Sequence, residues 1–385
     1  MIKVLIVDDS VVFQRILQKA ISMQRDMQVV GTAMNGEDAL KKINTLKPDL
    51  MVLDVEMPKM DGLQTLDEIR RRKLDVGVIM FSTLTSRGAD TTIKALSKGA
   101  FDFVAKPTGR GTFGESAKVV EEELIPKIRA FNHEKQHSSP RACIASLGKR
   151  STKDHKKGSH ISHLRPRLQD GRKTVRKPVR GFRPEAIGIG VSTGGPKALD
   201  HVIPNFPAHF RLPVFLVQHM PPVFTTQLAK RLNDKSKLMV AEAQDGETVK
   251  GGRVYVAPGD YHMELVSDGN KKVIRLNQKP HENSCRPAVD PLFRSLANTY
   301  GSKVVGVIMT GMGRDGLEGC KLLKAKGAYI IVQDKETSVV WGMPRFVTEH
   351  GLADRICSLD ELTPAILEVA GLHNQMAMTA KAGRI

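Results

Sequence analysis

The first 107 residues alternate between short apolar runs and amphipathic helical patterns, and this alternation constrains the fold more than any other feature. Apolar strands are expected at residues 2–7, 49–53, 76–81 and 101–105, separated by helical patterns at residues 11–21, 36–44, 62–71 and 90–97. Helical connections place successive strands parallel to one another. The sequence therefore predicts an α/β domain with a doubly wound parallel sheet.

Each of these predicted strands is followed by polar residues. In chain order these are Asp8, Asp9, Asp54, Ser82, Thr83 and Lys106. Because the carboxyl ends of parallel strands meet at one edge of a sheet, we expect these side chains to lie together. Neighbouring aspartates require a cation, and ligand sets made only of oxygen favour Mg²⁺. Asp54 would attack a phosphoryl group whose oxygens are neutralised by the metal, Lys106 and one hydroxyl. We assign that hydroxyl to Ser82 rather than Thr83, because Ser82 is the first polar residue after its strand.

A second candidate nucleophile lies in the middle of the chain. The run IGIGVSTGGP at residues 187–196 predicts a buried strand that turns sharply into a helix, and three glycines permit the turn. Residues 190–194 fit the G-x-S-x-G pattern, in which Ser192 would be an exposed nucleophile. Two other interpretations stay open for this motif alone: a phosphate-binding loop, and an ordinary strand–helix connection with a serine cap.

Two further predicted strands end in residues that could activate Ser192. Residues 214–219 end in His219, and residues 304–310 lead into a glycine-rich loop that carries Asp315. At a shared sheet edge, His219 would act as the base for Ser192, and Asp315 would orient the imidazole ring. Glycines on both sides of Met312 allow backbone N–H groups to point inward, as an oxyanion site requires. This pattern predicts a triad in the order Ser, His, Asp.

The sequence also offers a different chain order for a triad with the same serine. The α/β-hydrolases run Ser, Asp or Glu, His, which would select Asp290 and His350. We favour the first order because His350 follows a polar helical segment, with no strand leading to it. Between the triad residues, the segments 253–256, 263–266 and 273–276 are expected to add short antiparallel strands to the second sheet.

These motifs resemble those of two known families. Residues 1–131 resemble the receiver domain of two-component response regulators. Residues 184–372 resemble the catalytic domain of chemotaxis protein-glutamate methylesterases, the CheB family. The segments that carry this second resemblance are Val191–Pro196, Gln218–Pro221, Val256–Asp260, Cys285–Pro287, Thr310–Asp315 and Gly342–Pro344. The implied architecture is a flavodoxin-like receiver and a Rossmann-like methylesterase domain, joined by a linker at 132–183 and followed by a tail at 373–385.

The resemblance also implies roles for individual residues. For the esterase these are the triad Ser192, His219 and Asp315, and the oxyanion donor Met312. For the receiver they are the phosphorylated Asp54, the phosphoryl-contacting Lys106 with Ser82 or Thr83, and the Mg²⁺ ligands Asp8, Asp9, Asp54 and the backbone carbonyl of Glu56. The implied reaction is the hydrolysis of glutamate γ-methyl esters on the cytoplasmic helices of chemoreceptors, with deamidation of receptor glutamines. A histidine kinase would supply the phosphoryl group, and the esterase site would need no cofactor.

The linker carries most of the positive charge. Residues 132–183 contain 15 Lys or Arg against 3 Asp or Glu, a net +12 of the chain's +18. The segment has few apolar residues and no periodicity, which is typical of disorder. It is expected to be either a solvated tether or a means of weak attraction to acidic receptor surfaces and anionic lipid. Nucleic-acid binding is not expected, because aromatic residues are not interleaved with the basic ones.

Composition fits a cytoplasmic protein. The four cysteines have neither metal nor disulfide spacing, the first residues do not predict a signal peptide, and no apolar stretch approaches 18 residues. Three functions were compared: a phosphorylation-activated serine esterase, a response regulator whose second domain only binds receptors, and a DNA-binding regulator. The third is disfavoured because no helix-turn-helix pattern follows the receiver. The sequence favours the esterase.

Overall fold

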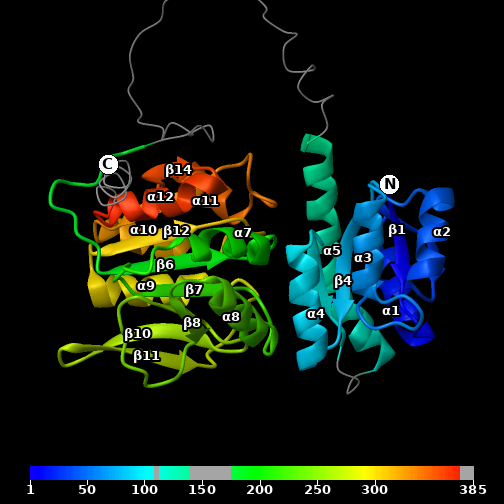
Figure 1. Ribbon diagram of the computed structural model, residues 1–385, viewed down its shortest axis with the longest axis horizontal. Helices are drawn as coiled ribbons and strands as arrows, with labels where there is room; N and C mark the ends of the chain where they lie inside the picture. The colour runs from blue at the N-terminus through cyan, green and yellow to red at the C-terminus, as the bar shows by residue number, and fades with distance from the viewer. Residues whose placement is uncertain (108–111, 139–174, 373–385) are drawn as a thin grey trace, which may run out of the picture.

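The computed structural model describes residues 1–107, 112–138 and 175–372, which form two α/β domains (Figure 1). The N-terminal domain contains a five-stranded sheet in the order β2-β1-β3-β4-β5, with every pairing parallel. Its strands are β1 (Ile2–Val7), β2 (Met27–Ala33), β3 (Leu50–Asp54), β4 (Gly77–Ser82) and β5 (Asp102–Ala105). The predicted doubly wound parallel sheet is confirmed. Only β2 was missing from the predicted strands, because most of its residues are half-buried and it has no continuous apolar run.

Five helices cover the two faces of this sheet. They are α1 (Val11–Ser22), α2 (Gly36–Leu46), α3 (Gly62–Arg71), α4 (Ser86–Ser97) and α5 (Phe113–Ser138). Local sequence fixes where three of them begin, since Asn35, Asp61 and Thr85 each accept a hydrogen bond from a backbone N–H of the first turn. Helix α5 continues past residue 131 into the segment assigned to the linker. Residues 139–174, which carry most of the linker, lie outside the described part of the chain.

The C-terminal domain contains a seven-stranded sheet in the order β14-β13-β12-β6-β7-β9-β8, again with parallel pairings throughout. Its strands are β6 (Ala186–Val191), β7 (Val214–Gln218), β8 (Met239–Glu242), β9 (Arg253–Val256), β12 (Val304–Ile308), β13 (Tyr329–Gln333) and β14 (Arg355–Cys357). Strand order reverses around β6, which lies between β7 and β12. Ligands of open α/β sheets bind at such a reversal.

The expectation of antiparallel additions to this sheet was wrong in detail. Strand β9 is nearly fully buried and lies inside the sheet, parallel to both β7 and β8. The other two segments, β10 (His262–Asp268) and β11 (Lys271–Asn277), pair antiparallel with each other in a separate hairpin. One face of β10 packs on α9 (Val289–Tyr300). Both hairpin strands mix buried, half-buried and exposed residues, so the hairpin forms a partly buried ribbon, whereas the nearly fully buried β9 lies in the sheet.

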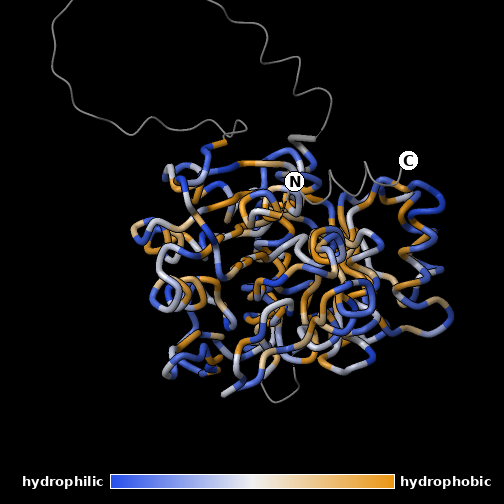
Figure 2. The backbone as a smooth tube through the Cα atoms, turned by 60° about the vertical axis from the view of Figure 1, so that its left-hand side comes forward, coloured by the Kyte–Doolittle hydropathy of each residue, from blue (hydrophilic) through white to orange (hydrophobic). Residues whose placement is uncertain are grey.

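Helices cover both faces of the second sheet. One layer is α7 (Gly195–Val202), the 3₁₀ turn η1 (Ile203–Asn205), α8 (Phe224–Lys235) and α12 (Leu359–Val369), and the other is α9, α10 (Leu317–Ala325) and α11 (Met343–Glu349). In Figure 2 apolar segments run through the interior of the molecule, while polar segments line the outside. None of the described helices has both the length and the apolar character needed to cross a bilayer.

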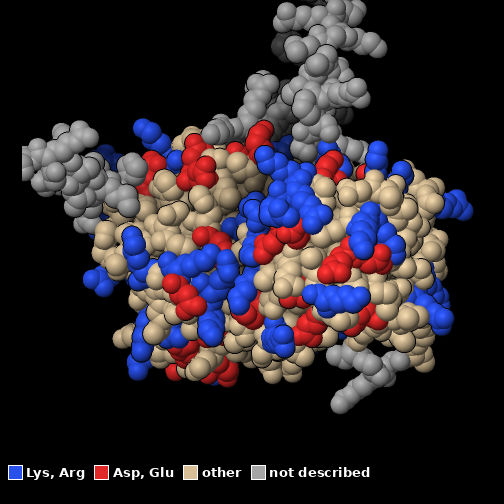
Figure 3. Space-filling model, turned by 45° about the vertical axis from the view of Figure 1, so that its right-hand side comes forward, with Lys and Arg blue, Asp and Glu red and all other residues tan. Residues whose placement is uncertain are grey.

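The two domains contact each other through α4, which packs against α7 and α8. The rings of Phe103 and Phe224 stack across this interface, with centroids 4.5 Å apart and planes inclined by 15°. On the face seen in Figure 3, Lys and Arg side chains lie interspersed with Asp and Glu. This face of the described domains therefore presents mixed charge, in contrast to the linker composition.

Candidate active site and receiver site

The turn that carries Ser192 is built by small residues. Strand β6 ends at Val191 and α7 begins at Gly195. Gly194 has φ +78°, and a Cβ there would lie 2.5 Å from Val339. A Cβ on Gly195 would lie 1.9 Å from Oε1 of Gln218. Only glycine combines that backbone angle with that close approach, so the sequence forces a sharp turn and leaves Ser192 at the carboxyl edge of the sheet.

Sheet register places His219 beside the serine. Val191 pairs with Gln218 in neighbouring parallel strands, so Ser192 and His219 are the next residues along the two chains. Gln218 fixes this corner further, because its Nε2 donates to the carbonyl of Ser192 at 2.9 Å. Among the described residues, the Ser192 hydroxyl has no hydrogen-bond partner. Catalytic hydrogen bonds are often formed only when substrate is bound, so this geometry is compatible with a nucleophile.

Asp315 is bonded directly to His219. The imidazole Nε2 lies 2.7 Å from Oδ2 of Asp315, and both side chains are buried. The same carboxylate accepts the backbone N–H groups of Val289 and Asp290, at 2.6 Å and 3.1 Å, at the start of α9. Burial alone would raise the pKa of Asp315, but the bond and charge of His219 and these two N–H groups lower it. Asp315 is therefore held ionised, with one oxygen directed at the imidazole.

The surroundings of His219 favour its protonated form. Burial alone would lower the pKa of His219, but the neighbouring sulfur of Cys285 and the carboxylate of Asp315 outweigh that effect and raise it. The position of Cys285 beside the imidazole was not foreseen from the sequence, although Cys285 begins one of the motifs that carry the resemblance. His219 must therefore lose its proton before it can accept one from a serine, and the same surroundings then stabilise the cation that forms during reaction.

The backbone directly before Met312 lies against the serine. A Cβ on the preceding Gly311 would be 2.8 Å from Cβ of Ser192, so the two chain segments touch. The Ser192 N–H donates to the carbonyl of Thr310 at 3.0 Å, which ties the turn to the end of β12. Within the described chain, the N–H of Met312 makes no hydrogen bond. A free backbone donor beside the nucleophile is what an oxyanion site requires.

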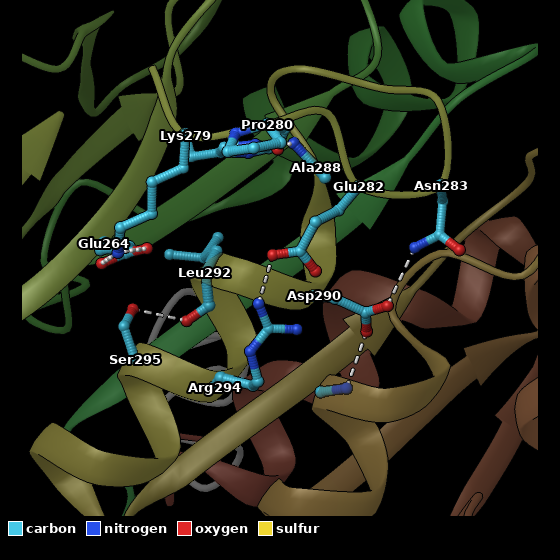
Figure 4. Close-up of polar contacts among 12 residues, drawn as sticks. Glu264, Lys279, Pro280, Glu282, Asn283, Ala288, Asp290, Leu292, Arg294 and Ser295 are labelled. Atoms are coloured by element: carbon cyan, nitrogen blue, oxygen red, sulfur yellow. Dashed lines mark hydrogen bonds and ion pairs between the residues drawn. The ribbon is translucent and has the colours of Figure 1, made fainter. Parts of the chain in front are cut away.

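The alternative triad is not brought together. Nδ1 of His350 lies 2.7 Å from the carbonyl of Phe346 in its own helix, and the side chain is exposed. Asp290 does lie in this region, but as a neighbour of Asp315, and its Oδ2 accepts a hydrogen bond from Asn283 (Figure 4). Asn283 was not among the predicted site residues, because a single amide in a loop carries no recognisable pattern.

The acidic residues of the first domain form one cluster, as expected. Carboxylate oxygens of Asp8, Asp9 and Asp54 all lie within 4.8 Å of one another. Lys106 Nζ lies 2.9 Å from Asp8 and 2.8 Å from Asp54, and these three side chains are buried while Asp9 is exposed. Burial, together with the charge of Asp8, raises the pKa of Asp54 to about 6. Burial likewise raises the pKa of Asp8.

The remaining predicted receiver residues surround this cluster. Ser82 is the last residue of β4 and is fully buried, and Thr83 follows with its hydroxyl 3.1 Å from that of Thr85. The backbone N–H of Glu56 donates to Asp54 at 3.3 Å. Within the described ranges, the buried Oδ2 of Asp8 has no hydrogen-bond donor beyond its ion pair with Lys106. A buried carboxylate oxygen with this spare capacity, in a set of three carboxylates, fits a hard divalent cation such as Mg²⁺.

Two polar contacts cross from the first domain to the elements around Ser192. Thr193 Oγ1 donates to Asp102 Oδ2 at 2.7 Å, and both residues are buried. Ser97 Oγ donates to Asp200 at 2.8 Å, and Arg231 and Lys235 pair with the same carboxylate. These bonds tie β5 and α4 of the first domain to the turn after the nucleophile and to α7.

One parallel-sheet domain carries a cluster of aspartates with a lysine, and the other carries a Ser, His, Asp arrangement. Together they define the class of protein as a response regulator with an enzymatic output domain. Comparison with known proteins agrees. The response regulator receiver model matches residues 4–117, and the CheB methylesterase model matches residues 187–366.

A protein-glutamate methylesterase/protein-glutamine glutaminase of Trichodesmium erythraeum is 44% identical, with 96% of this chain and 99% of the relative covered. The protein with the same description in Thermotoga maritima is 40% identical, with 96% and 98% covered. The crystal structure of the methylesterase catalytic domain from that organism is 46% identical and covers 48% of this chain and 98% of its own, with a TM-score of 0.48. The chain belongs to the family of protein-glutamate methylesterases/protein-glutamine glutaminases.

Proposed function

We propose that this protein hydrolyses glutamate γ-methyl esters on chemoreceptors, with Ser192, His219 and Asp315 as its triad. The observation that carries the triad is the 2.7 Å bond between His219 Nε2 and Asp315, next to Ser192 at the strand-order reversal. Because Nε2–H donates to Asp315, Nδ1 is the ring nitrogen left to accept the serine proton.

The reaction then follows from these positions. The Ser192 oxygen attacks the ester carbonyl carbon as His219 takes its proton, and the Met312 N–H stabilises the oxygen that becomes negative. The carbon–methoxy bond breaks, and methanol leaves with the proton from His219. In the second half of the reaction, His219 takes a proton from water, and the water oxygen attacks the carbonyl carbon of the glutamyl-enzyme. The bond to the Ser192 oxygen breaks, His219 returns the proton to that oxygen, and a free glutamate is left. Replacing methanol by ammonia as the leaving group gives deamidation of a receptor glutamine.

The first domain is proposed to control access to this site. Asp54 would accept a phosphoryl group from a histidine kinase, with Asp8, Asp9, Asp54 and the Glu56 carbonyl holding Mg²⁺. The metal would neutralise charge on the transferred phosphoryl oxygens. Lys106 and Ser82 or Thr83 would contact the phosphoryl group. In the unphosphorylated protein, the contacts of β5 and α4 with the Ser192 turn would limit access of a receptor helix.

The proposed domain boundaries are, in chain order, a receiver at 1–131, a linker at 132–183, a catalytic domain at 184–372 and a tail at 373–385. The protein is proposed to act in the cytoplasm, where receptor methylation helices are exposed. Linker charge would steer it weakly toward acidic surfaces. Replacing the linker Lys and Arg by Gln should then slow association with receptor membranes at low salt, and the difference should vanish at high salt.

Methanol release from receptor membranes that carry labelled methyl esters tests the proposal as a whole. Wild type should release methanol, and Ser192→Ala should release none while keeping the melting temperature, because a hydroxyl at the sheet edge contributes little to the core. Methanol release by Ser192→Ala at the wild-type rate would refute the mechanism.

A further inference from the structure

The carboxylate of Asp315 is surrounded by more donors than the triad itself supplies. One oxygen, Oδ2, faces His219 Nε2 and the N–H of Val289. The other, Oδ1, accepts three bonds, at 3.0 Å from Asn283 Nδ2, 3.1 Å from the N–H of Asp290 and 2.9 Å from the N–H of Gly316. Of these three donors, only Asn283 acts through its side chain.

The amide of Asn283 bridges two carboxylates. Its Nδ2 lies 3.0 Å from Asp315 Oδ1 and 3.0 Å from Asp290 Oδ2. An amide nitrogen carries two hydrogens, so each carboxylate can receive one. Asp290 and Asp315 are 3% and 2% exposed, and without a shared donor their charges would oppose each other in a poorly solvated place. Consistent with this, burial and the charge of Asp315 raise the pKa of Asp290 to about 6.

Asp290 is in turn fixed from a second helix. Asp290 lies in the first turn of α9, and its Oδ1 accepts a 2.7 Å hydrogen bond from the N–H of Gly319 in α10. The Asn283 loop is pinned to α9 a second time by the ion pair of Glu282 with Arg294 at 2.5 Å (Figure 4). Asn283 and Ser284 both have positive φ, +51° and +62°, which costs energy for residues other than glycine. The loop therefore holds the amide in place at a local cost.

We propose that Asn283, oriented by Asp290, is a positioning residue that holds the Asp315 carboxylate so that Oδ2 faces His219. The proposal rests on the triad of the proposed function. Asn283 acts through Asp315 and does not touch the substrate. Through Asn283, the 282–286 loop joins α9 and the start of α10 in contacting the Asp315 carboxylate. The carboxylate in turn holds the imidazole in one tautomer and one orientation.

Asn283→Gly is the sharpest test, because glycine accepts positive φ and the change removes the whole side chain together with its amide. Asn283 is exposed on its outer side, so folding should survive. Losing a donor to a buried carboxylate should lower kcat for methanol release roughly tenfold, with little change in KM. Asp290→Asn should act in the same direction, because Gly319 and Asn283 donate to different oxygens of Asp290 and the substitution turns one of these acceptors into an NH₂ donor. His281→Ala is the matched control two residues away and should keep the wild-type kcat, because the His281 side chain is exposed and makes no hydrogen bond or ion pair within the described part of the chain.

Two measurements on the full chain, with phosphodonor and Mg²⁺ present, separate positioning from loss of fold. A fluorophosphonate probe should label Ser192 more slowly in Asn283→Gly, and the low-field proton resonance of the His219–Asp315 bond should shift or broaden while the melting temperature stays near wild type. Wild-type labelling and an unchanged resonance in Asn283→Gly, with Ser192→Ala unlabelled, would overturn the positioning role and leave the triad standing. Labelling of Ser192→Ala at the wild-type rate would overturn the triad, and this inference with it.

Discussion

The hydroxyl of Thr193 donates a 2.7 Å hydrogen bond to the carboxylate of Asp102, so the residue directly after the nucleophile is bonded to the first domain. Both groups are buried, and Asp102 also lies 3.7 Å from Lys127. Next to this bond, Phe103 stacks on Phe224 of the second domain. The contact between domains therefore includes the turn that carries Ser192, where its rupture would change access most directly.

Asp102→Ala should raise the rate of methanol release by the unphosphorylated chain. A hydrogen bond to a charged group contributes about 1.5–3 kcal/mol, and about 1.4 kcal/mol moves an equilibrium tenfold. We therefore expect a basal rate roughly ten times that of wild type and a smaller response to a phosphodonor. Asp26→Ala is the control, because Asp26 pairs with Arg129 on the surface of the same domain. Equal basal rates in Asp102→Ala and wild type would show that this bond does not limit access.

Asp54→Asn should make the protein more stable at neutral pH. The pKa of the Asp54 carboxyl is about 6 in the folded protein and 3.8 in the unfolded chain. Its contribution to the free energy of unfolding is therefore fully present only below pH 3.8 and is lost as the pH rises through 6. Asparagine has the same shape but cannot ionise, so Asp54→Asn avoids this loss in the free energy of unfolding. The gain should be about 1 kcal/mol or more, because one pKa unit corresponds to about 1.36 kcal/mol. Thermal melts with and without Mg²⁺ measure this. Mg²⁺ should raise the melting temperature of wild type more than that of Asp54→Asn, and a lower melting temperature for the variant at pH 7 would contradict the argument.

The parallel sheets and most of the candidate site could be predicted because both depend on short stretches of chain. An apolar run that ends in Asp54 or His219 indicates a buried strand and, at the same time, places the polar side chain at the sheet edge. The glycines around Ser192 likewise report a turn that only they allow. Strand β2 was missed because it is half-buried, and β9 was placed wrongly because four residues do not reveal the direction of their neighbours.

The contacts made by side chains from distant loops could not be predicted in the same way. Cys285 and Asn283 reach the triad from a loop with positive φ, and no periodic pattern reports where such a loop packs. The bond between Thr193 and Asp102 depends on how two separately folded sheets dock. In these cases the residue types were visible in the sequence, but their partners were set by tertiary packing.

Gly342→Ala tests the oxyanion assignment without touching the triad. Gly342 has φ −97°, which alanine tolerates. An added Cβ, however, would lie 2.6 Å from the carbonyl of Gly311 and 3.1 Å from Cα of Met312. The Met312 backbone must then move, and loss of one oxyanion donor costs on the order of 10² in kcat. Gly114→Ala is the control, since a Cβ there meets no atom closer than 4.0 Å. An unchanged kcat in Gly342→Ala, despite a displaced backbone in its structure, would remove Met312 from the oxyanion site.

Cys285→Ser should move the acid limb of the pH profile to lower pH. His219 must be neutral to accept the serine proton, so kcat/KM rises as pH increases through the pKa of His219 in the free enzyme. The sulfur of Cys285 and the carboxylate of Asp315 raise that pKa against the effect of burial. Removing the sulfur leaves only Asp315 to oppose burial, so the pKa falls and activity persists into more acidic solution. Profiles of methanol release measured for wild type, Cys285→Ser and Cys285→Ala should show the same downward displacement in both variants. Superimposable acid limbs for all three proteins would mean that Cys285 does not influence the charge of the catalytic imidazole.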